Sequence, residues 1–271
     1  MTSRQNGLSL IELMVALLLS TFLILAVTQI FLDNRTHHSF QSSQVSNLEN
    51  ARFAELLLNG YLKRAGYRRT PDTLIETAFP RRAADASCAE FARGQVVTTA
   101  PQGFCIRYQP MTSGELDCTG SAAAVFDDSE VFTNPPLDKL VILAFRYAPP
   151  ADATQLHQGT LQCRNIMIAG SEFIDLVSNV ADFSVDFGYG PNDVMDKRIT
   201  SYGTNGTGII RAVRYSVLLA SEPNRRIPGS NSPILTRWLD EINNAARLTT
   251  NDRNRLYQIT QSTQTLRNYM P

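Results

Sequence analysis

The stretch GLSLIELMVALLLSTFLILAVTQIFL, residues 7–32, is the most informative part of the sequence. It follows a polar leader, residues 1–7, that contains Arg4, and between residues 8 and 32 the only ionisable side chain is that of Glu12. No proline interrupts these 25 residues, so they predict a helix of roughly 38 Å, longer than the hydrocarbon core of a bilayer, which is about 30 Å thick. The sequence therefore predicts a helix that crosses a membrane once.

Two simpler interpretations of this stretch are a cleaved secretory signal peptide and a generic membrane anchor. A secretory signal has a shorter apolar region of about 7 to 15 residues and ends in a small-x-small site, whereas this one ends in Gln-Ile-Phe-Leu. A generic anchor has no use for Glu12, because an acidic side chain near mid-bilayer costs about 2.5–3.5 kcal/mol. Glu12 is therefore a functional candidate; the alternative is a carboxylate that snorkels to the nearby membrane surface.

The segment Gly-Leu-Ser-Leu-Ile-Glu-Leu, residues 7–13, followed by an apolar helix, resembles the class III signal of type IV pilins and type II secretion pseudopilins. The resemblance implies cleavage after Gly7 by prepilin peptidase and N-methylation of the new terminus at Leu8. It also implies that Glu12, as the fifth mature residue, pairs with the N-terminal amine of a neighbouring subunit. Leu8 departs from the phenylalanine usual in the family, and we expect it to slow methylation without blocking cleavage.

Residues 33–65 continue the helix in amphipathic form. Apolar side chains recur at three- and four-residue spacing, which predicts one buried stripe made of Val45, Leu48, Ala51, Phe53 or Ala54, Leu57, Leu58, Tyr61 and Leu62. No proline occurs before Pro71, so the helix can run unbroken from residue 8 to residue 65, roughly 87 Å, and Gly66 is its expected stop. Major pilins often carry a helix-breaking proline in the apolar half, and its absence favours a minor pilin.

Residues 66–271 read as one α+β unit joined directly to the helix. Short β-rich segments alternate with Gly, Pro, Asn and Asp clusters, and residues 233–248 are predicted to form a short helix with Trp238 in the core. The predicted fold class is α+β, a long N-terminal helical stalk packed on a mainly antiparallel β-sheet domain, the type IV pilin fold. The expected strands are residues 95–99, 104–109, 139–148, 160–169, 183–189, 209–220 and 255–266.

Several short segments are similar to PilW-type minor pilins and occur in the same order along the chain. They are LKRAGY (62–67), DCTG (117–120), LQC (161–163), NVADF (179–183), AVRYSVLL (212–219) and LRN (266–268). This resemblance implies a subunit that helps initiate pilus assembly near the tip, with twitching motility, adhesion or DNA uptake downstream. The expected partners are other minor pilins, the major pilin, a tip adhesin, prepilin peptidase and the inner membrane. A J-type minor pseudopilin of type II secretion is the alternative.

The cysteines are Cys88, Cys105, Cys118 and Cys163. They lack C-x-x-C spacing, and an even number fits two disulfides in an oxidising compartment such as the periplasm. Three pairings are possible. The resemblance to PilW-type chains, in which the D-C-x-G and L-x-C segments recur together, implies Cys118 with Cys163 and leaves Cys88 with Cys105.

The sequence offers no catalytic constellation, and we expect neither an enzyme nor a cofactor or metal site. Charges balance at 25 basic and 25 acidic residues, which argues against nucleic-acid binding. No G-x-S-x-G, P-loop or H-E-x-x-H motif occurs, and the glycines of residues 203–208 read as a hairpin loop. Asn192, Asp193 and Asp196 could offer oxygen ligands to calcium, but their spacing is not that of an EF-hand loop, and we expect a surface turn instead. A membrane-tethered periplasmic binding domain is the remaining, less favoured class.

Overall fold

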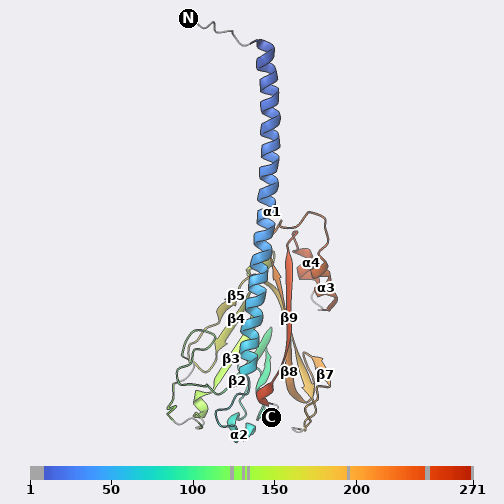
Figure 1. Ribbon diagram of the computed structural model, residues 1–271. Helices are drawn as coiled ribbons and strands as arrows, with labels where there is room; N and C mark the ends of the chain where they lie inside the picture. Colours follow the sequence, from blue (N-terminus) through green and yellow to red (C-terminus); the bar gives the residue numbers. More distant parts are fainter. Residues whose placement is uncertain are drawn as a thin grey trace.

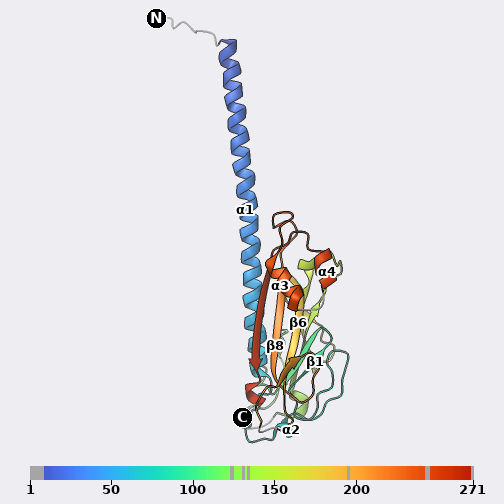
Figure 2. The same ribbon diagram turned by 90° about the vertical axis from the view of Figure 1, so that its right-hand side faces the viewer.

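The computed structural model describes residues 9–122, 125–129, 132, 135–193, 196–241 and 245–269. Its dominant element is α1, a single helix over Leu10–Arg64 with Ser9 at its N-cap. The first part of α1 projects alone, and the last part lies along the globular domain (Figures 1 and 2). The helix ends where predicted, because Gly66 takes φ +74° and its N–H donates to the carbonyl of Arg107 at 2.9 Å. A residue with a side chain is strained in this backbone conformation.

Two antiparallel sheets form the globular domain, in agreement with the mainly antiparallel domain that the strand pattern predicts. The first sheet has the order β1-β2-β3-β4-β5 and the second has the order β7-β6-β8-β9. The strands span Val97–Ala100 (β1), Gly103–Tyr108 (β2), Val141–Ala148 (β3), Thr160–Asn165 (β4), Ile174–Val177 (β5), Val180–Gly190 (β6), Ser201–Gly203 (β7), Ile209–Ala220 (β8) and Tyr257–Thr265 (β9). Seven of them correspond to expected strands, and β5 and β7 are additional.

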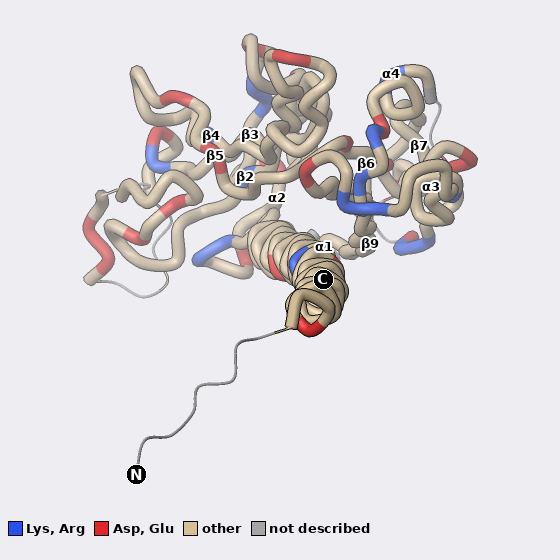
Figure 3. The backbone as a smooth tube through the Cα atoms, turned by 90° about the horizontal axis from the view of Figure 1, so that it is seen from above, with Lys and Arg blue, Asp and Glu red and all other residues tan. Residues whose placement is uncertain are grey.

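The second half of α1 packs against both sheets. It contacts β8 and β9 of the second sheet and β2 and β5 of the first, and in the view from above it lies in front of both groups of strands (Figure 3). Ala51, Ala54, Leu58 and Leu62 are buried there. The helix thus covers the place where the apolar faces of both sheets meet, and the predicted fold class is confirmed.

The buried stripe of α1 is narrower than the sequence pattern suggests. Val45 and Leu48, two members of the predicted stripe, are 54% and 41% exposed, whereas the polar Asn47 is buried. Of the alternatives Phe53 and Ala54, Ala54 is the buried one. The side-chain amide of Asn47 donates to the carbonyl of Leu256 at 3.2 Å, just before β9 begins. The side-chain N–H of this buried polar residue is therefore bonded to a backbone group that periodicity cannot reveal, while Asn47 Oδ1 is buried with no hydrogen-bond partner among the described residues.

The helix predicted over residues 233–248 corresponds to α3 over Pro233–Glu241 and α4 over Ala245–Thr250. Residues 242–244 of that prediction lie outside the described residues. Trp238 is in the core as predicted, 1% exposed, and its indole N–H donates to Asp182 Oδ2 at 3.1 Å. Four one-turn elements complete the fold: α2 (Ile75–Ala78), η1 (Leu137–Lys139), η2 (Leu156–Gln158) and η3 (Arg267–Tyr269).

Candidate assembly surface and disulfide framework

The apolar half of α1 is free of the globular domain. The large apolar side chains from Leu10 to Leu32 are between 49% and 79% exposed, and the mean hydropathy of the segment reaches 2.6. By length and composition this helix can cross a membrane, a test that a signal sequence near an N-terminus also passes. A continuous apolar surface of this size is not left in water and marks contact with lipid or with another protein.

Glu12 lies in the first turn of α1 within this apolar surface. The Ser9 backbone N–H donates to its Oε2 at 3.4 Å, and a carboxylate at this end is also favoured by the helix dipole. Within the described residues Glu12 has no ion-pair partner, and the first basic residue along the helix, Arg35, is 23 residues away, about 35 Å. A cationic partner for Glu12 therefore has to come from outside the described helix.

Gly7 and Leu8, the predicted processing residues, lie outside the described residues. Their cleavage and methylation remain predictions.

The structure joins Cys88 to Cys105 and Cys118 to Cys163, the two pairs that the resemblance implies. The first disulfide ties the segment before β1 to β2, and its sulfurs lie in a small apolar cluster with Ile142 and Ala144 of β3. The second ties a loop to β4 across 45 residues of chain. Both bridges therefore hold long connections of the first sheet in place.

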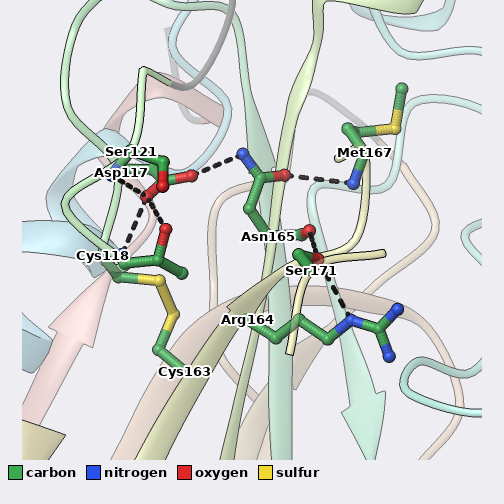
Figure 4. Close-up of a disulfide and its surroundings, with 9 residues drawn as sticks. Asp117, Cys118, Ser121, Cys163, Arg164, Asn165, Met167 and Ser171 are labelled. Carbon is green, nitrogen blue, oxygen red and sulfur yellow. Dashed lines mark hydrogen bonds between the residues drawn. A yellow bond between two sulfur atoms is a disulfide. The ribbon is translucent and has the colours of Figure 1, made fainter. Parts of the chain in front are cut away.

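A buried hydrogen-bond network supports the Cys118–Cys163 bridge (Figure 4). The Asn165 side-chain amide donates to Asp117 Oδ2 at 2.7 Å, and the Thr119 backbone N–H donates to Asp117 Oδ1 at 2.7 Å. Asp117 is 4% exposed and Asn165 fully buried. The DCTG segment pointed to Asp117, but Asn165 was missed because its partner is 48 residues away.

No group of three or more His, Cys, Asp or Glu side chains arranged for a metal occurs in the described part of the chain. Asp196, one of the possible calcium ligands, instead pairs with Arg198 at 2.6 Å, and hydrogen bonds from the Arg198 side chain and backbone lower the pKa of this carboxyl to about 2. The Asp196 backbone N–H donates to the carbonyl of Asp193 at 3.2 Å, and residues 194 and 195 lie outside the described residues.

Comparison with known proteins adds two findings. Residues 2–28 match the family model described as the prokaryotic N-terminal methylation motif, which supports the predicted class of N-terminal signal. Among solved structures, the fold is similar to a type IV-like pilin from Thermus thermophilus, with 14% identity and a TM-score of 0.43 over 83% of this chain and 98% of the other. No curated protein sequence matches the chain.

Proposed function

We propose that this chain is a membrane-anchored, type IV pilin-like structural subunit and not an enzyme. One observation carries the proposal: the methylation motif of residues 2–28 includes the beginning of α1, a helix whose apolar half is exposed and free of the folded domain. A motif for N-terminal processing joined to such a helix fits a subunit that first sits in a membrane and then packs its helix against other subunits. The globular domain then faces the periplasm.

More specifically, we propose a PilW-type minor pilin that helps initiate pilus assembly and lies near the tip. The ordered PilW-like segments and the proline-free apolar half support this role over that of a major subunit. Its partners are then other minor pilins, the major pilin and prepilin peptidase, and a tip adhesin is a further partner. Crosslinking and capture from a pilus-forming host separates this role from that of a J-type pseudopilin, because the two systems supply different partner sets.

Processing is the first test of the proposal. We expect cleavage after Gly7, so that residues 1–7 form the leader and Leu8 the mature terminus, with residues 8–32 as the span, 33–65 as the second half of the stalk and 66–271 as the globular domain. The intact mass of protein extracted from membranes should lack residues 1–7 and carry one added methyl group. A cut near Gln29, or an uncut chain, would rule out the pilin role.

Assembly depends in this proposal on Glu12. A carboxylate in apolar surroundings is costly unless it is paired, and among the described residues the Glu12 carboxylate accepts a hydrogen bond from the Ser9 amide and has no ion pair. Once Gly7 is removed, each subunit gains a cationic amine at Leu8, about one helical turn from Glu12 in sequence. The amine of one helix can then meet the Glu12 carboxylate of the next and set their axial register, while apolar side chains supply the packing.

Substitution of Glu12→Val tests this mechanism. The variant should accumulate and be cleaved normally but fail to prime filaments, because it keeps the apolar surface and loses the charge that fixes register. Thr21→Val is a matched control, since the Thr21 hydroxyl is already bonded within its own helix to the carbonyls of Leu17 and Leu18. The measurement is surface piliation, with crosslinking to partner pilins, at equal protein abundance. Normal piliation and unchanged crosslinks in Glu12→Val would show that the globular domain alone directs assembly.

A further inference from the structure

A polar pocket of about 540 Å³ lies between the middle of α1 and the globular domain. It is at the end of the domain that faces the apolar half. Two contacts show the direction of the domain along α1. Asn47, in the middle of α1, bonds to the chain just before β9, whereas Asn268, which follows β9, donates to the carbonyl of Lys63 at the end of α1. The segment between β8 and α3 reaches α1 there (Figure 1), and the Arg225 guanidinium donates to the Ser39 hydroxyl.

One face of α1 forms a wall of this pocket, and it is entirely polar. Its residues recur at three- and four-residue spacing, so their side chains lie on one side of the helix. They are Arg35, His38, Ser39, Ser42, Ser43, Ser46 and Asn47. This face begins three residues after the apolar run ends, and it presents hydroxyl and guanidinium donors rather than packing surface.

The opposite wall adds positive charge and unused donors. Arg225 binds Ser39 and Glu222, the one acidic side chain of the lining, yet its Nε is buried with no hydrogen-bond partner among the described residues. Behind this wall, Arg255 is fully buried without a carboxylate ion pair in the described structure, and its Nη1 lies 2.9 Å from Nδ1 of His157. The pocket is therefore suited to a ligand that is anionic and accepts hydrogen bonds.

His157 completes the donor set. Burial and the adjacent Arg255 charge lower the pKa of His157, so the ring is neutral near pH 7. A neutral ring whose Nδ1 accepts from Arg255 carries its proton on Nε2 and is a donor there.

The position of the pocket along α1 sets which anion can reach it. Arg35 is about 4.5 Å beyond Leu32, the end of the apolar run, and Ser46 is about 21 Å beyond it. A headgroup layer extends roughly 5–7 Å beyond each side of the hydrocarbon core. With α1 across a bilayer, the Arg35 end of the pocket therefore lies at the depth of lipid phosphates.

We propose that this pocket binds the phosphodiester headgroup of an anionic phospholipid from the membrane that α1 crosses. The inference rests on the membrane anchoring in the proposed function. Arg35 and the guanidinium of Arg225, whose side chain is 29% exposed, supply the charge, and the serine hydroxyls of α1 supply further donors to the phosphate oxygens. Pockets of about 300–1,000 Å³ hold ligands of this size. Such a contact would fix the height and tilt of the globular domain above the bilayer before assembly.

The test uses the full chain reconstituted in nanodiscs of phosphatidylcholine with a minor fraction of phosphatidylglycerol. Native mass spectrometry then measures which lipid stays bound to the released protein. The wild-type protein should retain phosphatidylglycerol well above its bulk fraction, and Arg35→Gln or Arg225→Gln should reduce this enrichment about tenfold, the loss of one charge-assisted hydrogen bond. Arg237→Gln is the matched control, because Arg237 is an exposed arginine of α3 paired with Glu241 outside the pocket lining.

Retention at the bulk lipid ratio, or equal losses in Arg35→Gln and Arg237→Gln, would overturn the proposal. Arg35 is exposed and makes no intramolecular bond in the described structure, so its variant stays informative if Arg225→Gln folds poorly. Displacement of phosphatidylglycerol by added inorganic phosphate would also overturn the lipid source and assign the pocket to free phosphate. Insertion into pure phosphatidylcholine, measured by resistance to alkaline extraction, is scored separately: failure to insert refutes the anchoring itself, whereas insertion without lipid preference refutes only the pocket.

Discussion

Packing of α1 on the globular domain can be tested at two leucines that are two residues apart. Leu58 is fully buried, whereas Leu56 is 74% exposed. Leu58→Ala removes about three buried carbon groups at roughly 0.8 kcal/mol each, or about 2.4 kcal/mol of transfer free energy. The unfilled cavity adds to this loss, and buried Leu→Ala changes cost about 2–5 kcal/mol in all. Leu56→Ala should change the free energy of unfolding by less than about 0.5 kcal/mol.

The assay is urea unfolding of the full chain in detergent micelles, followed by the fluorescence of Trp238, the single tryptophan. Trp238 is 1% exposed in the folded domain, so its emission reports loss of the core. The midpoint for Leu58→Ala should fall clearly below that of the wild type, with an unchanged slope, because the native contacts are lost without altering the surface that unfolding exposes. Equal midpoints for Leu58→Ala and Leu56→Ala would refute the packing of α1 described here.

Two further predictions concern the disulfides and pH. Non-reducing peptide mapping should find both disulfides, and free thiols or a Cys105–Cys118 link would contradict the pairing. Replacing Cys118 and Cys163 by Ala should lower the free energy of unfolding by about 4 kcal/mol, about 1 kcal/mol more than replacing Cys88 and Cys105. The difference arises because the entropy that a disulfide removes from the unfolded chain grows with the length of the closed loop, here 45 against 17 residues. The lowered pKa of His157 contributes stability that is present above about pH 6.5 and lost as pH falls through the folded-state value, by less than about 1 kcal/mol given the partial exposure. The urea midpoint should therefore decrease less between about pH 7.5 and pH 5.5 in His157→Gln than in the wild type. His37→Gln is the control, because His37 is exposed and its replacement should leave the decrease unchanged. A decrease as large in His157→Gln as in the wild type would contradict the role of His157.

The helices and most strands could be predicted from the sequence because their signals are local. The strand over Ile209–Ala220 was predicted with its observed bounds, since its β-branched and aromatic residues and the glycine turn before it are adjacent in the chain. In contrast, Ile174–Val177 was missed. Two of its four residues are exposed, and it is a strand because it pairs with β4 at the edge of the first sheet.

The burial of three arginines could not be predicted from the sequence either. Arg107, Arg211 and Arg255 are each at most 1% exposed, and each donates to backbone carbonyls of loops that are distant in sequence. A charged side chain in a sequence predicts exposure, because burial is costly unless the charge is paired or hydrogen-bonded. Here the carbonyls that compensate for burial are assembled only by the fold.

The sequence by itself determined the features that depend on neighbouring residues: the apolar helix, the carboxylate of Glu12 within it, the processing motif, and the helix stop at Gly66. The tertiary structure alone decided that the strands form two sheets, that α1 covers both, that Asn47 rather than Val45 faces the domain, and that a polar pocket lies beside the middle of α1. The physical reason is that helix periodicity and turn chemistry act within a few residues. Sheet membership, buried polar partners and pockets depend instead on groups that only folding brings together.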